Sequence, residues 1–197
     1  MKSVRIKDLV EAMLYTDLTV SQIAELWAGR CSLTPIEILD LDTSVQNRLG
    51  LLFTSDVLDA RTQNELGYMF AKHVLPIFEK QFPEDSCPRE SLDIFHRWNA
   101  GSAAEIENFS AGQKVWALSC TVENASEYPG KLAVSAAIYS VSQALWRSPF
   151  SAARAASLAA GWAVSEPCPP EVGDAAKAAE GAWQIEQTKI VLLAQGW

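Results

Sequence analysis

Apolar side chains recur at intervals of three and four residues along most of this chain, which is the spacing of amphipathic α-helices. The pattern predicts one helix over residues 4–16 and a second, capped by Thr19 or Ser21, that ends at Gly29. A third helix begins at the TPIE sequence of residues 34–37, where threonine and glutamate can form a capping box around a first-turn proline. No stretch alternates convincingly between apolar and polar residues, so no strand is predicted.

The longest apolar stripe covers residues 57–82 and follows a shorter apolar segment at residues 44–53. Ser55 and Asp56 stand at its beginning and predict the start of a core helix. Pro76 lies inside this stripe and lacks a backbone N–H, so the helix should kink there or divide at the preceding residue.

The next segment, PEDSCPRESLDIFHRW at residues 83–98, combines several helix start signals. Asp85 or Ser86 can cap the first free N–H groups, and Pro88 suits the first turn. Glu90 places a carboxylate at the positive end of the helix dipole. These signals predict a helix that ends near Gly101.

The second half of the chain predicts at least three further helices. Residues 102–105 (SAAE) form a second candidate capping box. The helix after it should bury an apolar face, whose members are Ile106, Phe109, Val115, Trp116 and Leu118. Residues 131–165 are rich in alanine and serine and divide into two helices at Ser148-Pro149. A last helix follows the proline cluster that ends at Pro170.

We therefore predict an all-α fold of about eight helices in antiparallel pairs, arranged as a bundle or a short superhelical array. The length fits a single helical domain over residues 1–197. Residues 1–54 are a candidate N-terminal subdomain, and residues 131–197 form an alanine-rich C-terminal half.

The charge balance restricts the choice of partner. Sixteen basic and twenty-four acidic residues give a net charge of −8, which argues against nucleic acid or an anionic membrane and favours a basic protein. The same charge can also serve only to keep a cytosolic protein in solution. The apolar runs are shorter than the roughly 20 residues that span a bilayer, and the N-terminus has no signal-peptide pattern, so a cytoplasmic location is expected.

Catalytic and metal-binding signals are weak. His73 and His96 lie in no recognisable motif, and the four cysteines are scattered without zinc spacing. Cys87 sits just inside a predicted helix N-terminus near Arg89, so it is either an ordinary first-turn residue or a thiol whose ionised form is favoured. No phosphate-binding glycine pattern is present. We expect no enzyme activity, no metal and no cofactor.

Two groups of residues remain as candidates for binding. The seven tryptophans either fill gaps between alanine-rich helices or stack on a ligand. Acidic residues gather near predicted loops and helix starts, where they either cap helices or dock a cationic partner. The candidate docking residues are Asp40, Asp42, Asp56, Asp59, Glu84 and Asp85.

The segment FAKHVLPIFEKQFPEDSCPRESLDIFHRWNAG at residues 70–101, together with residues 60–67 and the alanine-rich tail, resembles a family of bacterial immunity proteins from polymorphic toxin systems. The resemblance rests on a loop of the form P-x-D-x-R-P-R before an aromatic-bearing helix. Its acid, proline, second arginine and aromatic residue correspond to the structural-motif residues Asp85, Pro88, Arg89 and Trp98. Cys87 departs from the pattern, because the family usually has arginine at that position.

The resemblance implies a non-enzymatic protein that binds a cognate toxin and blocks its action. Many such toxins are basic nucleases, which fits an acidic inhibitor. From the residues alone, Asp85 would cap its helix and Arg89 would tie the loop to a neighbour. Two alternatives remain: a helical scaffold or adaptor that binds another protein through its tryptophans, and an enzyme that uses Cys87 or a histidine. The oligomeric state stays open.

Overall fold

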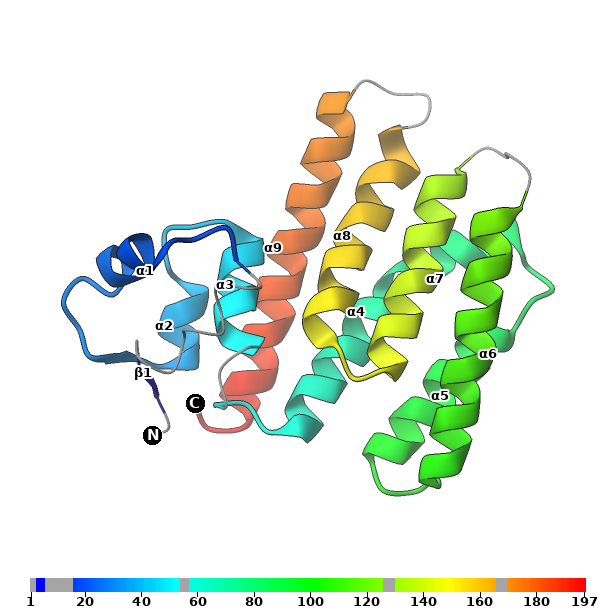
Figure 1. Ribbon diagram of the computed structural model, residues 1–197, viewed down its shortest axis with the longest axis horizontal. Helices are drawn as coiled ribbons and strands as arrows, with labels where there is room; N and C mark the ends of the chain where they lie inside the picture. Colours follow the sequence, from blue (N-terminus) through cyan, green and yellow to red (C-terminus); the bar gives the residue numbers. More distant parts are fainter. Residues whose placement is uncertain (1–2, 6–15, 54–56, 126–129, 166–169) are drawn as a thin grey trace. The chain divides into compact units, whose positions relative to one another are not determined.

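The computed structural model describes residues 3–5, 16–53, 57–125, 130–165 and 170–197 (Figure 1). Within these ranges it has nine α-helices and one pair of two-residue strands, which confirms the predicted all-α class with about eight helices. In chain order the elements are β1 (Val4–Arg5), α1 (Val20–Leu26), β2 (Ser32–Leu33), α2 (Pro35–Leu39), α3 (Val45–Phe53), α4 (Ala60–Gln81), α5 (Cys87–Asn99), α6 (Glu105–Asn124), α7 (Lys131–Leu145), α8 (Pro149–Ser165) and α9 (Pro170–Ala194).

The chain divides into two compact units. Unit 1 consists of residues 1–62 and 181–197, and unit 2 consists of residues 63–180. The boundaries fall inside α4 and α9. The predicted single domain, its subdomain at residues 1–54 and its C-terminal half at residues 131–197 stay predictions.

Two capping boxes begin the short helices of unit 1. At α1, Thr19 accepts a hydrogen bond from the N–H of Gln22, and the Gln22 side chain accepts one from the N–H of Thr19 at 2.8 Å. Thr34 and Glu37 make the same reciprocal pair at α2, with proline at the first helical position. Both boxes satisfy N–H groups that a helix start leaves without partners, and both helix starts were predicted.

The first residues of the chain differ from the prediction. Val4 pairs with Leu33 in antiparallel register, so Val4–Arg5 form strand β1 against β2. Both paired side chains are buried, which gives this short pairing an apolar face. The predicted helix over residues 4–16 is therefore wrong at its start, and residues 6–15 lie outside the described residues.

Helix α4 starts later than predicted and is not divided. Asp59 accepts a hydrogen bond from the N–H of Thr62 at 2.7 Å and caps the helix. The predicted start at Ser55 and Asp56 lies outside the described residues. Pro76 lies within α4, which runs on to Gln81, so the predicted division is wrong and the alternative, a kink at Pro76, stays a prediction.

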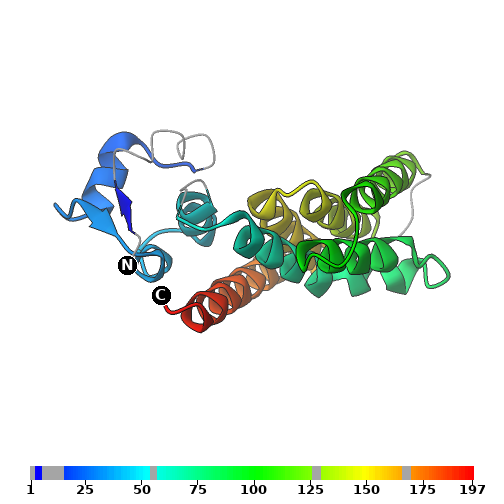
Figure 2. The ribbon, with the colours of Figure 1, turned by 90° about the horizontal axis from the view of Figure 1, so that it is seen from below.

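In unit 2, helices α6, α7 and α8 lie side by side, and α4 and α5 lie behind them (Figures 1 and 2). Phe70, Phe78 and Phe95 of the rear helices are fully buried. Alanines and serines of α7 and α8 let these helices approach closely, and Ser140 donates a hydrogen bond across to the carbonyl of Ala152 at 2.8 Å. The predicted division of this region at Ser148-Pro149 is confirmed.

Of the apolar face predicted for helix α6, Val115 is buried, but three of the larger side chains are not. Ile106 is 70% exposed, and Phe109 and Trp116 are about half exposed. The buried residues are mostly small or polar: Asn108, Ala111, Gly112, Val115, Ser119 and Val122. They recur at helical spacing, so the helix packs closely through this buried face and leaves its larger side chains exposed.

The predicted capping box at Ser102 and Glu105 is also wrong. The N-cap of α6 is Ala104, which makes no side-chain cap hydrogen bond. Ser102 belongs to the end of α5 instead, because both its N–H and its hydroxyl donate to the carbonyl of Arg97.

Candidate functional site

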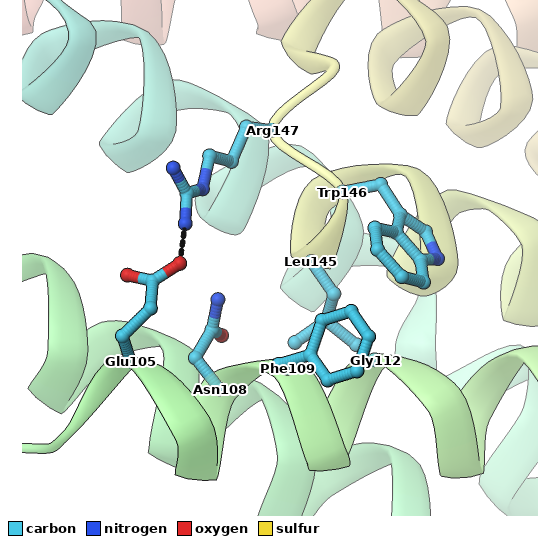
Figure 3. Close-up of a pocket in the computed structure, with 7 residues that line it drawn as sticks. All are labelled: Glu105, Asn108, Phe109, Gly112, Leu145, Trp146 and Arg147. Atoms are coloured by element: carbon cyan, nitrogen blue, oxygen red, sulfur yellow. Dashed lines mark hydrogen bonds and ion pairs between the residues drawn. The ribbon is translucent and has the colours of Figure 1, made fainter.

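Unit 2 contains a pocket of about 280 Å³ between the first turns of α6 and the turn that joins α7 to α8 (Figure 3). One side comes from α6 and the other from the end of α7. The lining residues are Glu105, Asn108, Phe109, Gly112, Leu145, Trp146 and Arg147.

The α7–α8 turn has an unusual residue at its centre. The N–H of Ser148 donates to the carbonyl of Gln143, and the N–H of Arg147 donates to that of Ala144, both at 2.9 Å. This is the Schellman motif, whose central residue adopts a left-handed conformation and is usually glycine. Arg147 adopts that conformation here, with φ +61°.

Helix α5 ends in the same motif with the expected residue. There the N–H of Gly101 donates to Trp98 and that of Ser102 to Arg97, both at 2.8 Å, and Gly101 has φ +81°. A non-glycine residue in this conformation costs about 1–2 kcal/mol. Strained residues of this kind are common at functional sites, so Arg147 is a candidate functional residue.

The guanidinium of Arg147 lies at one side of the pocket. It is 4.3 Å from the centre of the Trp98 ring and forms an ion pair with Glu105 (Figure 3). Both charged side chains are about half exposed, so water screens the ion pair. Trp98 does not line the pocket itself, but it contacts Arg147, which does.

Two aromatic rings form the apolar side of the pocket. Phe109 and Trp146 meet edge to face, with ring centres 5.8 Å apart and an interplanar angle of 88°. Gly112 lies beside the indole, where a Cβ atom would be 3.7 Å from the ring. Because glycine carries no side chain, residue 112 places no side-chain atom against the indole of Trp146, which lines the pocket together with Phe109 (Figure 3).

Asn108 is the polar residue of the pocket that lacks a partner. Its side chain is 3% exposed, and its Oδ1 atom has no hydrogen-bond partner among the described residues. A buried amide atom without a hydrogen bond costs about 1–3 kcal/mol. Such groups are rare in native proteins, and this one lines the pocket.

The structural-motif residues hold α5 against its neighbours. Asp85 accepts a hydrogen bond from the N–H of Cys87 at 3.0 Å, at the start of a helix that carries Pro88 in its first turn. Arg89 donates two hydrogen bonds of 2.6 Å to Glu79, which joins the start of α5 to the end of α4. These bonds raise the pKa of Arg89 above its ordinary value.

The thiol of Cys87 is not activated. Partial burial raises its pKa, and the nearby charge of Asp85 acts in the same direction, against a hydrogen bond from Ser91. This shift is opposite to the one that a nucleophilic thiolate requires. The two histidines also have structural contacts: His73 lies 2.8 Å from the buried carboxylate of Glu180, and His96 stacks on Tyr68.

The predicted docking residues are divided between the units. Asp40, Asp42 and Asp59 lie in unit 1, Glu84 and Asp85 lie in unit 2, and Asp56 is outside the described residues. Asp40 accepts a hydrogen bond from Lys189, Asp59 caps α4, and Asp85 precedes Ser86, the N-cap of α5, and accepts a hydrogen bond from the N–H of Cys87. Asp42 and Glu84 are exposed in loops. A docking role for this set stays a prediction.

Sequence reasoning missed most of the pocket. Glu105, Asn108 and Arg147 were not selected, and Phe109 was assigned to the core. Two signals in the sequence point to the pocket: the small-residue spacing on α6 and an arginine directly before a Ser-Pro helix start. Of the tryptophans, Trp27 is fully buried as a gap-filling residue, whereas Trp116 and Trp146 are about half exposed.

The part of the chain that the structure describes has no group of three or more His, Cys, Asp or Glu side chains that could hold a metal ion. Within the same ranges, every helix is too short or too polar to cross a bilayer. Comparisons with protein-family models, curated proteins and solved structures found no match.

Proposed function

We propose that this chain is a cytoplasmic, non-catalytic immunity protein that binds a cognate bacterial toxin and neutralises it stoichiometrically. The observation that carries the proposal is a row of large apolar side chains on the outer face of α6 and α7. We call this row the α6–α7 stripe. Its members, each 45–50% exposed, are Phe109, Trp116, Leu132, Tyr139 and Trp146.

The stripe is continuous because its residues are spaced by seven. Seven residues make nearly two turns, so Phe109 and Trp116 share one face of α6, and Leu132, Tyr139 and Trp146 share one face at α7. The two helices are antiparallel neighbours, and Phe109 meets Trp146 at one end. Trp116 lies seven residues after Phe109, and Tyr139 lies seven residues before Trp146. Because the helices are antiparallel, Trp116 and Tyr139 lie at the same level of the pair.

The core of unit 2 is formed by other side chains. Helices α6 and α7 pack through fully buried residues such as Val115 and Ile138, whereas the members of the stripe are about half exposed. A contiguous exposed apolar patch commonly marks a protein interaction site, and tryptophan and tyrosine dominate binding energies at such sites.

Charge and sequence resemblance favour a basic toxin as the partner. The chain carries a net charge of −8, and Glu105 and Glu123 lie near the two ends of the stripe on α6. Acidic groups around an apolar centre would speed association with a cationic protein. The resemblance of residues 70–101 to immunity proteins supports a toxin as that protein.

Protection of cells tests the proposal. The chain is expressed together with the toxin encoded beside its own gene, and growth and complex formation are measured. We expect protection and a stoichiometric complex, both weakened by the double substitution Trp116→Ser and Tyr139→Ser. The control Ile190→Ser removes an equally exposed apolar side chain outside the stripe and should leave protection intact. Absence of both protection and a complex would contradict the proposal.

A helical scaffold or adaptor is the alternative, since the stripe would equally serve a non-toxic partner. The chain is used as bait in a lysate of its own organism at low and high salt. A basic toxin domain released by salt supports the immunity role. Recovery of only a non-toxic partner that salt does not release supports the scaffold.

A further inference from the structure

We infer that the α6–α7 stripe binds one α-helix of the partner. This helix lies along α6 and α7, presents a large apolar side chain at about every second turn and carries basic residues beside its apolar face. The inference deepens the proposed function and rests on it, because it takes the toxin as the partner. It names the secondary structure and the side-chain pattern by which the toxin is held.

The spacing of the stripe favours a helix over an extended segment. Its large side chains stand at levels seven residues apart, which is about 10.5 Å along a helix. A helix that lies parallel to α6 and α7 repeats this distance between its own positions i and i+7, which are the usual anchor positions of a docked helix. In an extended strand, side chains on one face are about 6.6 Å apart and fall out of step with the levels. A helix therefore keeps its contacts along the whole stripe.

Large and small residues alternate along the stripe. Gly112 stands three residues after Phe109 and four before Trp116. Ser135 and Ser142 stand at the same position relative to the members of the stripe on α7. Gly112 and Ser142 are buried and Ser135 is half-buried, so no second large side chain rises between the levels at this position. Helices pack when the large side chains of one lie between those of its neighbours, so the partner's side chains at i and i+7 lie between these levels.

The size of the stripe matches one helix. Fourteen residues separate Leu132 from Trp146, which is about 21 Å and the length of an ordinary helix. A fully buried aromatic residue covers roughly 150–250 Å², so four half-exposed rings and Leu132 offer about 400–500 Å². A standard interface buries about 800 Å² of each partner, of which about 60% is apolar. The stripe therefore supplies the apolar part of one such interface.

Charge at the far end of the stripe favours a basic helix. Glu123 stands seven residues after Trp116, so it continues the row on α6, and it is exposed. Arg147 pairs with Glu105 at the other end, and Lys131 donates a hydrogen bond to a backbone carbonyl. The part of the chain that the structure describes contains no ion pair of Glu123. A lysine or arginine beside the apolar face of the partner helix would pair with it, and the net charge of −8 favours further basic residues.

Selection from a peptide library tests the pattern without the toxin. Random peptides of about 16 residues, long enough to cover the stripe as a helix, are displayed and selected for binding to the full chain. Peptides that also bind the folded double variant Trp116→Ser and Tyr139→Ser are removed, which leaves those that need the stripe. We expect these to share large apolar residues at i and i+7 with lysine or arginine beside them. Alternating apolar residues, no common spacing or no stripe-dependent peptide would overturn the inference.

A synthetic peptide with the selected pattern tests the helix itself. It is titrated into the full chain, and circular dichroism should show a gain of helix on binding. Proline in the middle of the peptide, on the face away from the stripe, breaks the helix without removing a contact. We expect it to weaken binding at least about tenfold relative to alanine at the same position. The control Ile190→Ser should bind as the unaltered chain does. Equal binding of the proline and alanine peptides overturns the inference.

The two proposals fail separately. If the chain does not protect against the toxin but the helical peptide still binds through the stripe, the immunity function fails and the helix-binding site stands. If the chain protects but the toxin does not compete with the helical peptide, the inference fails and the immunity function stands.

Discussion

Asn108 places an unsatisfied amide in a helix that otherwise packs through small side chains. We expect Asn108→Leu to raise the free energy of unfolding by about 1 kcal/mol, because it removes an unpaired buried polar group without a large change in size. Urea denaturation measures the change.

Asn47 provides the matched control. It is buried to a similar degree, but its side chain accepts a hydrogen bond from the N–H of Asp17 and donates one to Thr43, both at 3.1 Å. Asn47→Leu should therefore destabilise the chain. Equal destabilisation by both substitutions would show that Asn108 has a partner after all.

Arg147 also lowers the stability of the fold, because of its backbone conformation. Its left-handed conformation would suit glycine better, yet its guanidinium contacts Trp98 and Glu105 at the pocket. Single residues of this kind are difficult to identify in a sequence. A Schellman motif is expected where a glycine follows a helix, and here an arginine precedes a serine and a proline.

The two capping boxes of unit 1 have third helical residues of different charge, which allows a test of how stability falls at acid pH. At α1 the box uses Gln22, and at α2 it uses Glu37. Hydrogen bonds from the N–H and hydroxyl of Thr34 lower the pKa of Glu37 below its ordinary value of 4.5, and the charge of Arg30 adds to this. A carboxylate with a lowered folded-state pKa stabilises the fold above its unfolded pKa and loses this contribution as the pH falls through the folded-state pKa.

We therefore expect Glu37→Gln to keep the capping box but to lose its pH dependence. The melting temperature of the unaltered chain should exceed that of Glu37→Gln at pH 7, and the difference should shrink as the pH falls below about 4.5. Thermal unfolding at pH 7, 5 and 3 measures it. A difference that stays constant over this range would show that the ionised carboxylate of Glu37 adds nothing to the box.

Helices α8 and α9 approach each other within unit 2 through two glycines. A Cβ atom on Gly161 would lie 3.1 Å from the carbonyl oxygen of Gly173 and 2.5 Å from the side chain of Lys177. Helix propensity alone predicts that Gly161→Ala gains about 1 kcal/mol. Because the lysine and the helix backbone must both move, we expect a net loss of about 1–2 kcal/mol instead.

Gly112→Ala is the control, since its Cβ would make ordinary contacts at 3.7 Å. It should stabilise the chain by roughly 0.5–1 kcal/mol through helix propensity. Chemical denaturation compares the two variants. Stabilisation by both would mean that α8 and α9 lie further apart than the structure places them.

The sequence predicted the positions of the helices better than it predicted which of their faces and ends contact neighbouring helices. Local signals sufficed for α1 and α2, because a capping box involves only neighbouring residues. They misplaced the start of α6, because Ser102 makes its hydrogen bonds to the end of α5. They also misassigned Phe109 and Trp116, because periodicity shows which residues share a face but not which face a neighbouring helix covers.

At the scale of the whole molecule, the chain joins a strong negative charge to an exposed aromatic stripe, and these two features act on different steps of binding. Long-range charge accelerates the encounter with a basic partner, whereas buried aromatic contacts slow dissociation. Affinity alone would not separate the two contributions, but rate constants would.

We expect the association rate constant of the toxin complex to fall about tenfold or more between 50 and 500 mM salt, because salt screens the charge of −8, while the dissociation rate constant changes little. Trp116→Ala should do the opposite and raise the dissociation rate constant at every salt concentration, with Ile190→Ala as the matched control outside the stripe. Surface plasmon resonance on the purified complex measures both. Association that does not respond to salt would remove the charge argument for a basic toxin, and dissociation unchanged in Trp116→Ala would place the interface elsewhere on the chain.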